Sequence, residues 1–171
     1  MYKILCTGNP GDHTIARAIQ KMFPDADFAS RSTGYDLRFW NIKDEMHFRD
    51  KLTNYNVLIN SSFISNGAQQ KILEITRDCW DSGHIFNIGS TAENEGIISN
   101  LPMSYCVQKR ALRDMSLSLN SNKFRTTHIV AGGLNDGKPG HENWLHPDNV
   151  ANVISWILSS NLNIPLIGIE A

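Results

Sequence analysis

The strongest constraint on the fold is a regular alternation of short apolar runs with longer stretches of helical periodicity. Runs typical of buried strands occupy residues 2–6, 27–30, 56–62, 84–90, 125–133 and 163–169, and residues 36–40 form a weaker candidate. Helical patterns over residues 14–23, 43–52, 67–80, 105–119 and 146–158 separate these runs. This alternation predicts an α/β fold, Rossmann-like and doubly wound, with a mostly parallel seven-stranded sheet and helices on both faces.

The alternation continues over all 171 residues without repeats or a linker, so we expect one domain over residues 1–171. A composition of 41% hydrophobic and 19% charged residues, with a formal net charge of −1, lacks the basic excess that nucleic acid or an anionic membrane requires. No apolar stretch has the length of a membrane span, and the start lacks the apolar core of a signal peptide. Cys6, Cys79 and Cys106 are scattered, which favours reduced thiols in a cytoplasmic protein, with no metal or disulfide.

Ligands of doubly wound folds bind beyond the carboxyl ends of the strands, so the residues after each strand are the candidates. Gly8 follows the first strand and allows a tight turn close to a phosphate, with a helix beginning near Thr14. The loop is not G-x-G-x-x-G, so a plain connection remains an alternative. Asp12 would repel a phosphate unless it caps the helix, and His13 and Thr14 could compensate.

The second strand is followed by "SRSTG", which has no acidic residue where a site for NAD usually carries one. Arg31, flanked by Ser30 and Ser32, suits the 2′-phosphate of NADP(H). We therefore expect NADP(H) to be favoured over NAD(H), while Asp36 should point elsewhere unless a bent loop brings it close. A solvated arginine in a polar loop is the alternative.

Three further candidates follow later strands. Ser90 ends the strand over residues 84–90, and Tyr105 and Lys109 lie one turn apart on one face of the next helix. Each of them could be an ordinary polar residue if it stood alone.

Together these features resemble the short-chain dehydrogenase/reductase family, over essentially the whole chain. The family has a glycine turn, an "NNAG"-like strand end, a serine after the fifth strand, and then Tyr-x-x-x-Lys. The counterparts here are Gly8, "NSSF" over residues 60–63, Ser90, Tyr105 and Lys109, in the same order. "HPDNVANVISWIL" is similar to the family's late "PEDVA" helix, and "AGG" at residues 131–133 stands for its "PG" turn. The first loop, with Thr14 and Ala16 after its glycine, resembles the divergent, enoyl-reductase-like branch.

The resemblance implies hydride transfer between a nicotinamide and a small-molecule carbonyl or alcohol. Tyr105 would be the general acid/base, Lys109 would lower its pKa, and Ser90 would orient the substrate oxygen. The family's catalytic asparagine has no firm counterpart, and Asn66 is the candidate. Asn41 replaces an aspartate that the family often places near the adenine. The residues implied to hold the dinucleotide are Gly8, Asn9, His13, Thr14, Ile15, Ser30, Arg31, Ser32, Asn41, Ile42, Asn60, Ser61, Ser62, Tyr105, Lys109 and Gly132.

The resemblance also implies a homodimer or homotetramer, paired through the two helices that flank the fifth strand. The residues that could serve such an interface, or pack in the core, are Ile72, Ile75, Trp80, Leu112, Met115 and Leu119. The usual substrate lid is reduced to "GLNDGKPGHENWL", so a dinucleotide-binding sensor or regulatory protein of the same fold is an alternative. A metal-dependent hydrolase using His141, Glu142 and His146 is a third reading, but the spacing matches neither H-E-x-x-H nor an i,i+4 pair.

Overall fold

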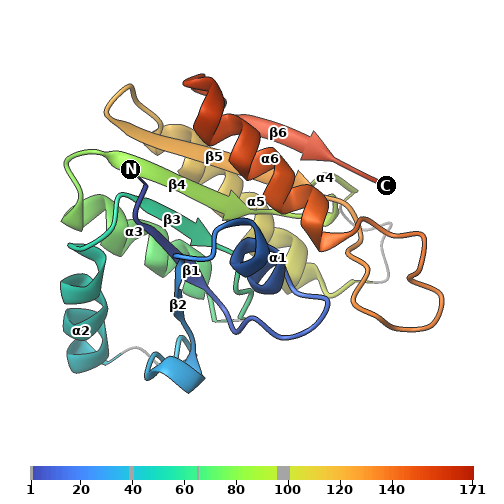
Figure 1. Cartoon of the computed structure of the whole chain (residues 1–171), viewed down its shortest axis with the longest axis horizontal. Coiled ribbons are helices and arrows are strands. Elements are labelled where there is room, and N and C mark those ends of the chain that lie inside the picture. Colours follow the sequence, from blue (N-terminus) through green and yellow to red (C-terminus); the bar gives the residue numbers. More distant parts are fainter. Residues whose placement is uncertain (1, 39–40, 65, 96–100) are drawn as a thin grey trace.

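The computed structural model describes residues 2–38, 41–64, 66–95 and 101–171. Its described strands form a single parallel sheet in the order β2-β1-β3-β4-β5-β6 (Figure 1). The strands are β1 Ile4–Thr7, β2 Asp27–Ala29, β3 Val57–Asn60, β4 Gly83–Ile88, β5 Phe124–Ala131 and β6 Leu166–Ile169. The order reverses between β1 and β3, because the chain adds β2 on one side of β1 and then crosses to the other. The predicted doubly wound α/β fold is confirmed.

Helices cover both faces of the sheet (Figure 1). They are α1 Ile15–Met22, α2 Ile42–Leu52, α3 Ala68–Cys79, α4 Ala92–Glu95, α5 Met103–Leu119 and α6 Pro147–Ser160, with a short 3-10 helix at Arg31–Thr33. One apolar cluster lies between the sheet and the pair α1 and α6, and a second lies between the opposite face and α2, α3 and α5. Among the described residues, none of the helices combines the length and hydropathy that crossing a membrane requires.

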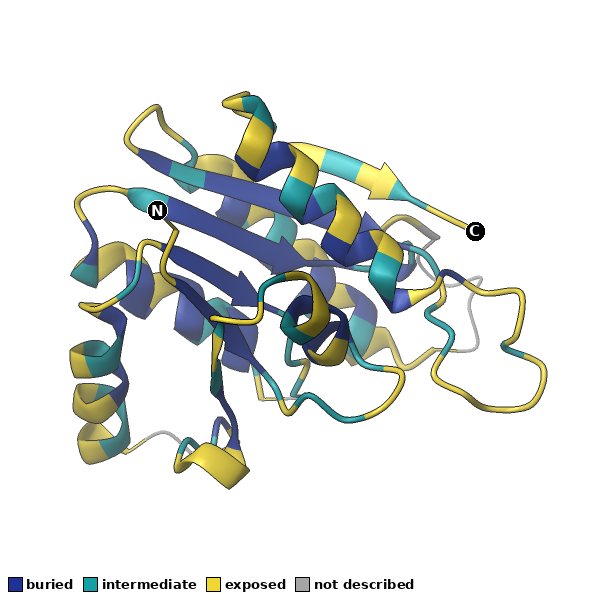
Figure 2. Ribbon diagram, viewed as in Figure 1, coloured by how far each residue is buried: buried dark blue, intermediate teal, exposed yellow. Residues whose placement is uncertain are grey.

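Burial follows this layering. The four residues of β1 and of β3 are all buried, as expected for strands covered on both faces, whereas β6 at the sheet edge alternates between exposed and half-buried (Figure 2). All three cysteines are free, and burial raises the pKa of the Cys6 thiol to about 12. On α2, Leu52 is fully buried, whereas Met46 is 61% exposed.

The described part of the sheet has six strands, and residues 36–38 of the weak candidate over residues 36–40 belong to none of them. Residues 37–38 form a turn, and residues 39–40 lie outside the described residues. The Asp36 carboxylate accepts hydrogen bonds from the Arg38 amide at 3.1 Å and from its Nε at 2.8 Å. A side chain that bonds the backbone two residues on stabilises a turn in competition with a strand. Leu37 is nevertheless buried, which explains the strand-like apolar signal.

Candidate functional site

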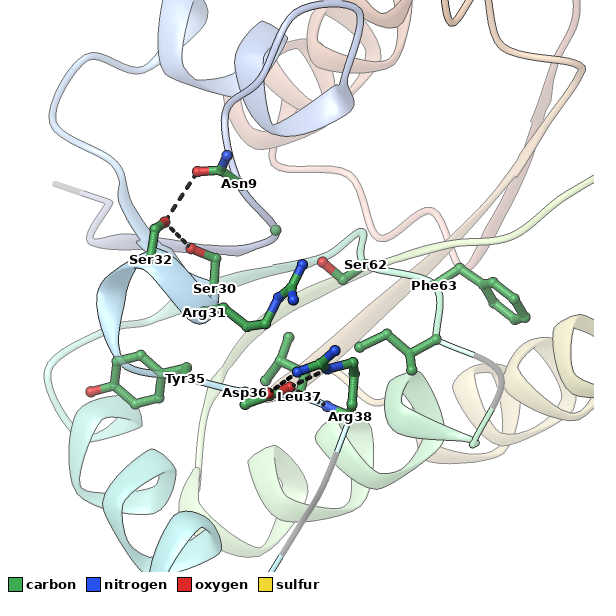
Figure 3. A pocket seen from close by; sticks show the side chains of 12 residues that line it. Asn9, Ser30, Arg31, Ser32, Tyr35, Asp36, Leu37, Arg38, Ser62 and Phe63 are labelled. Carbon is green, nitrogen blue, oxygen red and sulfur yellow. Dashed lines mark hydrogen bonds and ion pairs between the residues drawn. The ribbon is translucent and has the colours of Figure 1, made fainter.

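A cavity of about 480 Å³ lies at the reversal point, beyond the carboxyl ends of β1, β2 and β3 (Figure 3). This is the position at which doubly wound sheets bind ligands. We call it the groove; its lining residues are Gly8, Asn9, Ser30, Arg31, Ser32, Tyr35, Asp36, Leu37, Arg38, Ser62, Phe63 and Ile64. The predicted dinucleotide residues that line it are Gly8, Asn9, Ser30, Arg31, Ser32 and Ser62.

The floor of the groove depends on a glycine. Gly8 has φ +119°, and a Cβ at this position would lie 2.9 Å from Oγ of Ser62. The Thr7 hydroxyl accepts hydrogen bonds from the amides of Ser61 and Ser62 at 3.0 and 3.1 Å, which draws the end of β3 against the end of β1. The backbone after β1 is therefore open to close approach by a ligand only because residue 8 lacks a side chain.

Two arginines line the groove. Arg38 donates to Asp36 through Nε at 2.8 Å and through Nη2 at 2.5 Å, and this pair stands beside Arg31 in Figure 3. The hydrogen bond from Arg38, with a smaller contribution from the charge of Arg31, lowers the pKa of Asp36 to about 2. The expectation that Asp36 points elsewhere is therefore wrong, because the turn at residues 37–38 folds its carboxylate back. Sequence reasoning also missed Arg38, although an aspartate, whose side chain tends to bond the backbone two residues on, is a signal for such a turn.

The other predicted residues of the first loop do not line the groove. Thr14 caps α1: its Oγ1 accepts from the amide of Arg17 at 3.1 Å and donates to the carbonyl of Gly11 at 2.7 Å. Ile15 is buried in the core. His13, with φ 55°, packs against the loop after β5, where a Cβ on Gly137 would lie 2.7 Å from its ring. His13 and Thr14 line a separate cleft between α1 and the start of α6.

Asn41, predicted near the adenine, and the predicted dinucleotide residues Ile42 and Gly132 do not line the groove. Oδ1 of Asn41 accepts from the amide of Asp44 at 3.0 Å and so caps α2. The side chain of Ile42 is 82% exposed on that helix. Gly132, after β5, donates its amide to the carbonyl of Ile169 at 2.8 Å and lines a shallow cleft with Trp144.

Ser90, Tyr105 and Lys109 are brought together as the sequence predicts. Ser90 follows β4, and the other two lie on the first turns of α5. Burial raises the pKa of the half-buried Tyr105 above its ordinary value, while a side-chain hydrogen bond with Ser90 acts in the opposite direction. Nζ of Lys109 lies 5.7 Å from the centre of the Tyr105 ring. We call these three residues the catalytic cluster.

Lys109 is only 3% exposed, and its ammonium has two neutral acceptors. Nζ donates to Oε1 of Gln69 and to the carbonyl of Ile88, both at 2.7 Å. Burial lowers the pKa of Lys109 to about 7, against an opposing contribution from the charge of Glu93. Burial is the largest influence on the Tyr105 pKa and raises it, so the lowering of that pKa by Lys109 stays a prediction.

Gln69, on the first turn of α3, is the functional residue that sequence reasoning missed. Asn66, the candidate for the catalytic asparagine, is exposed, and its amide donates to the carbonyl of Arg38. The residue that contacts Lys109 is Gln69, three positions later and 3% exposed. A polar residue on the buried stripe of an otherwise amphipathic helix is the signal that could have identified it.

Asn60 is a structural residue and does not line the groove. It is fully buried, and its Nδ2 donates to the carbonyl of Gln69 at 2.8 Å and to Oδ1 of Asn87 at 2.9 Å. Ser61 is likewise directed inward, with its Oγ donating to the carbonyl of Thr7 at 2.5 Å. These two predicted contacts to the dinucleotide are therefore replaced by contacts that join neighbouring strand ends.

A buried pair of hydrogen-bonded side chains, Glu93 and His128, lies next to Ser90. Oε2 of Glu93 is 2.9 Å from Nε2 of His128 on β5, with both side chains fully buried, and 3.4 Å from the amide of Ser90. Arg110 on α5 donates twice to the carbonyl of Glu93, at 2.8 and 3.1 Å. A Cβ on Gly89 would lie 2.2 Å from Nε2 of His128, so the pair fits only against a glycine.

The residues of the proposed metal site serve local structure. Nδ1 of His141 lies 2.7 Å from Asp136, and its ring stacks on Trp144 with centres 3.6 Å apart. Nδ1 of His146 caps α6 by accepting from the amide of Asp148. Within the described ranges, no group of three or more His, Cys, Asp or Glu side chains is arranged to hold a metal ion.

The solved structures to which this chain is similar include several dehydrogenases. The chain is similar to a short-chain dehydrogenase/reductase from Brucella melitensis, described as SDR:glucose/ribitol dehydrogenase, with a TM-score of 0.72, 15% identity, and coverage of 98% of this chain and 94% of that one. It is also similar to serine dehydrogenase from Escherichia coli, with a TM-score of 0.67, 17% identity and coverage of 98% and 97%.

A third similar structure is a short-chain dehydrogenase from Burkholderia cenocepacia in complex with NADP, with a TM-score of 0.71, 10% identity and coverage of 99% and 89%. No family model and no curated protein matches the sequence. At these identities the likeness is one of fold, and the fold of this chain is that of the short-chain dehydrogenases.

Proposed function

We propose that this chain is an NADP(H)-dependent oxidoreductase of the short-chain dehydrogenase type, acting on a carbonyl or alcohol carbon. The observation that carries the proposal is buried Lys109 with its Nζ 5.7 Å from the centre of the Tyr105 ring, one turn along the same helix, in a site where Ser90 influences the pKa of Tyr105. Ser90 follows β4 and the other two residues lie on α5, and Phe63, whose ring contacts that of Tyr105, lines the groove at the reversal point of a doubly wound sheet.

The groove supports a dinucleotide as the cofactor. Gly8 leaves the space that a Cβ would fill, and Arg31 lies between Ser30 and Ser32, whose hydroxyls are linked at 2.8 Å. A guanidinium among hydroxyls suits the 2′-phosphate of NADP(H). Two of the structurally similar dehydrogenases are complexes with NADP or NADP+.

The nicotinamide, when bound, supplies or accepts a hydride at the substrate carbon. The Ser90 hydroxyl would orient the substrate oxygen, and Tyr105 would donate a proton to that oxygen as negative charge develops on it. A tyrosine whose pKa is raised keeps its proton at neutral pH, which suits donation in the reductive direction. A charged Lys109 at its distance of 5.7 Å from the ring centre would stabilise the resulting phenolate by about 3 kcal/mol at an effective dielectric of about 20.

The test has a binding step and a turnover step. NADPH and NADH should each be compared with no ligand by thermal shift, because a ligand that binds only the folded state raises the melting temperature. A panel of carbonyl substrates should then be screened with the dinucleotide that binds. Tyr105→Phe should abolish turnover and leave dinucleotide affinity within a few-fold, because the hydroxyl acts on the substrate. Turnover retained by Tyr105→Phe would refute the catalytic assignment.

One observation favours a second candidate, a dinucleotide-binding sensor or regulatory protein of the same fold. The ammonium of Lys109 is engaged by Gln69 and Ile88 and lies under the ring of Phe63, 5.2 Å from the ring centre. A sensor would bind a dinucleotide in the groove and show no turnover over the whole carbonyl panel. An enzyme would show turnover that Tyr105→Phe removes.

We also propose a homodimer or homotetramer. The described structure offers little support for the helix-pair interface, because Ile72, Ile75 and Leu112 are fully buried in the core and Trp80 is 8% exposed. Light scattering at micromolar concentration would test the proposal, and a monomer would refute it.

A further inference from the structure

The residue after Ser62 places an aromatic ring between the groove and the catalytic cluster. Phe63 lines the groove, and in Figure 3 it lies at the far end from Asn9 and Ser32. Its ring meets the ring of Tyr105 edge-on, with centres 4.6 Å apart and an interplanar angle of 76°. Phe63 therefore places a bulky ring after β3, at the position of the glycine in the "NNAG"-like strand end of the short-chain dehydrogenase/reductase family.

The same ring covers the ammonium of Lys109. Nζ lies 5.2 Å from the centre of the Phe63 ring and 5.7 Å from the centre of the Tyr105 ring, within the range of a cation–π contact. Gln69 and the carbonyl of Ile88 contact Nζ as well. Lysine side chains are seldom fully buried, and these contacts together leave Lys109 only 3% exposed.

Phe63 itself is not locked in the core. Its side chain is 39% exposed and belongs to a loop, and Ile64 beside it packs against the core beneath the groove. A ring that is 39% exposed and belongs to neither apolar core cluster can change rotamer without opening a cavity in the core. The geometry thus combines a covered lysine with a partly exposed cover.

We propose that Phe63 gates the catalytic cluster, so that its ring must leave the Tyr105 ring before the nicotinamide end of a dinucleotide can reach Tyr105 and Lys109. The inference rests on the proposed function, because it takes the groove as the site of the dinucleotide. With the ring closed, the adenosine half binds in the groove and the nicotinamide half gains few contacts. The apparent affinity of the whole dinucleotide is then reduced by the fraction of molecules in which the gate is open.

The experiment compares two ligand pairs, each a dinucleotide and its adenosine half: NADPH with adenosine 2′,5′-bisphosphate, and NADH with ADP. Titrations use the full chain and its Phe63→Ala, Phe63→Ser and Phe63→Leu variants. In the unmodified protein each dinucleotide should bind about as tightly as its half. Phe63→Ala and Phe63→Ser should raise the affinity for the dinucleotide about tenfold, which corresponds to about 1.4 kcal/mol of binding free energy. Both variants should leave the affinity for the adenosine half within twofold of that of the unmodified protein. Phe63→Leu keeps the bulk of the side chain and should behave like the unmodified protein.

The adenosine half reports in every variant whether the groove is intact, so a folding defect would show as loss of its binding. The gate is refuted if both small variants leave the ratio of the two affinities unchanged or weaken the dinucleotide, or if Phe63→Leu tightens it equally. Failure of both ligand pairs to bind the unmodified protein would overturn the proposed function, and this inference with it.

Discussion

Nζ of Lys109 lies 2.7 Å from Oε1 of Gln69, and the amide nitrogen of that same glutamine donates to the carbonyl of Asn60 at 2.7 Å and to that of Ile88 at 3.2 Å. One buried side chain therefore ties the carboxyl ends of β3 and β4 to the lysine of α5. All the polar atoms of the Gln69 side chain are satisfied in a site that is almost closed to water. The hydrogen bond to Gln69, more than the contact with the Tyr105 ring, therefore explains the direction in which the Lys109 ammonium points.

Gln69→Leu should lower the free energy of unfolding by about 1–3 kcal/mol, because the Lys109 ammonium and two buried carbonyls lose a partner. Urea denaturation measures the change. Gln70→Leu is the matched control: Gln70 is on the same helix, is only half-buried and makes one hydrogen bond, to the carbonyl of Gln108 at 2.6 Å. Gln70→Leu should lower the free energy of unfolding clearly less than Gln69→Leu does. Equal losses of stability would contradict this role of Gln69.

The stability of the protein should rise with pH above neutrality, relative to a Lys109→Met variant. The pKa of Lys109 is lowered from 10.5 to about 7 in the folded state, so between these values the unfolded chain binds more protons than the folded one. The contribution of Lys109 to stability is thus complete above about pH 10.5 and is lost as the pH falls to about 7. Urea denaturation between pH 7 and 9.5 gives the free energy of unfolding of the unmodified protein and of Lys109→Met. The difference between these two free energies should change by about 1 kcal/mol per pH unit. A constant difference would mean that the Lys109 pKa is not lowered.

The sequence was sufficient to predict the parallel sheet and to identify candidate functional residues at the ends of its strands. Strong apolar runs such as "NVLIN" and "HIFNI" form β3 and β4, and spacing along one helix brings Tyr105 and Lys109 together. Local patterns did not predict contacts between distant residues. Glu93 and His128 are 35 positions apart and meet only because β4 pairs with β5. Likewise Phe63 contacts Tyr105 through tertiary packing that no periodicity reports.

Local competition explains the remaining errors. The apolar Leu37 favours a strand, but Asp36 forms a turn with Arg38 and moves a carboxylate into the groove. Thr14 and Asn41, both predicted to bind the dinucleotide, are the caps of α1 and α2. A hydroxyl or amide before a helix suits both roles, so residue type alone does not separate them.

Gly89→Ala should be strongly destabilising. The added Cβ would lie 2.2 Å from Nε2 of His128 and 2.8 Å from Oε2 of Glu93, so the buried pair would have to shift. Forcing extra volume into a packed interior costs about 1–3 kcal/mol, and disturbing a buried hydrogen bond adds to this. Gly11→Ala is the control, because a Cβ there meets nothing within 4 Å, and it should change stability by less than about 0.5 kcal/mol. Thermal or urea unfolding that shows similar losses for both variants would contradict this account of the buried pair.

Arg31→Ala should lower NADPH affinity about ten- to hundredfold and leave NADH affinity nearly unchanged. The 2′-phosphate of NADPH carries close to two negative charges, and a charge-assisted contact with an arginine is worth about 1.5–3 kcal/mol. Arg31 lines the groove, whereas the charge of neighbouring Arg38 is partly compensated by its two bonds to Asp36. Arg31 is therefore the better partner for an added phosphate. Arg77→Ala is the matched control, because Arg77 is exposed on α3 and pairs with Asp78 outside the groove. Fluorescence titration of both dinucleotides against the three proteins measures the preference, and equal affinities for NADPH and NADH in the unmodified protein would rule out the NADP(H) assignment.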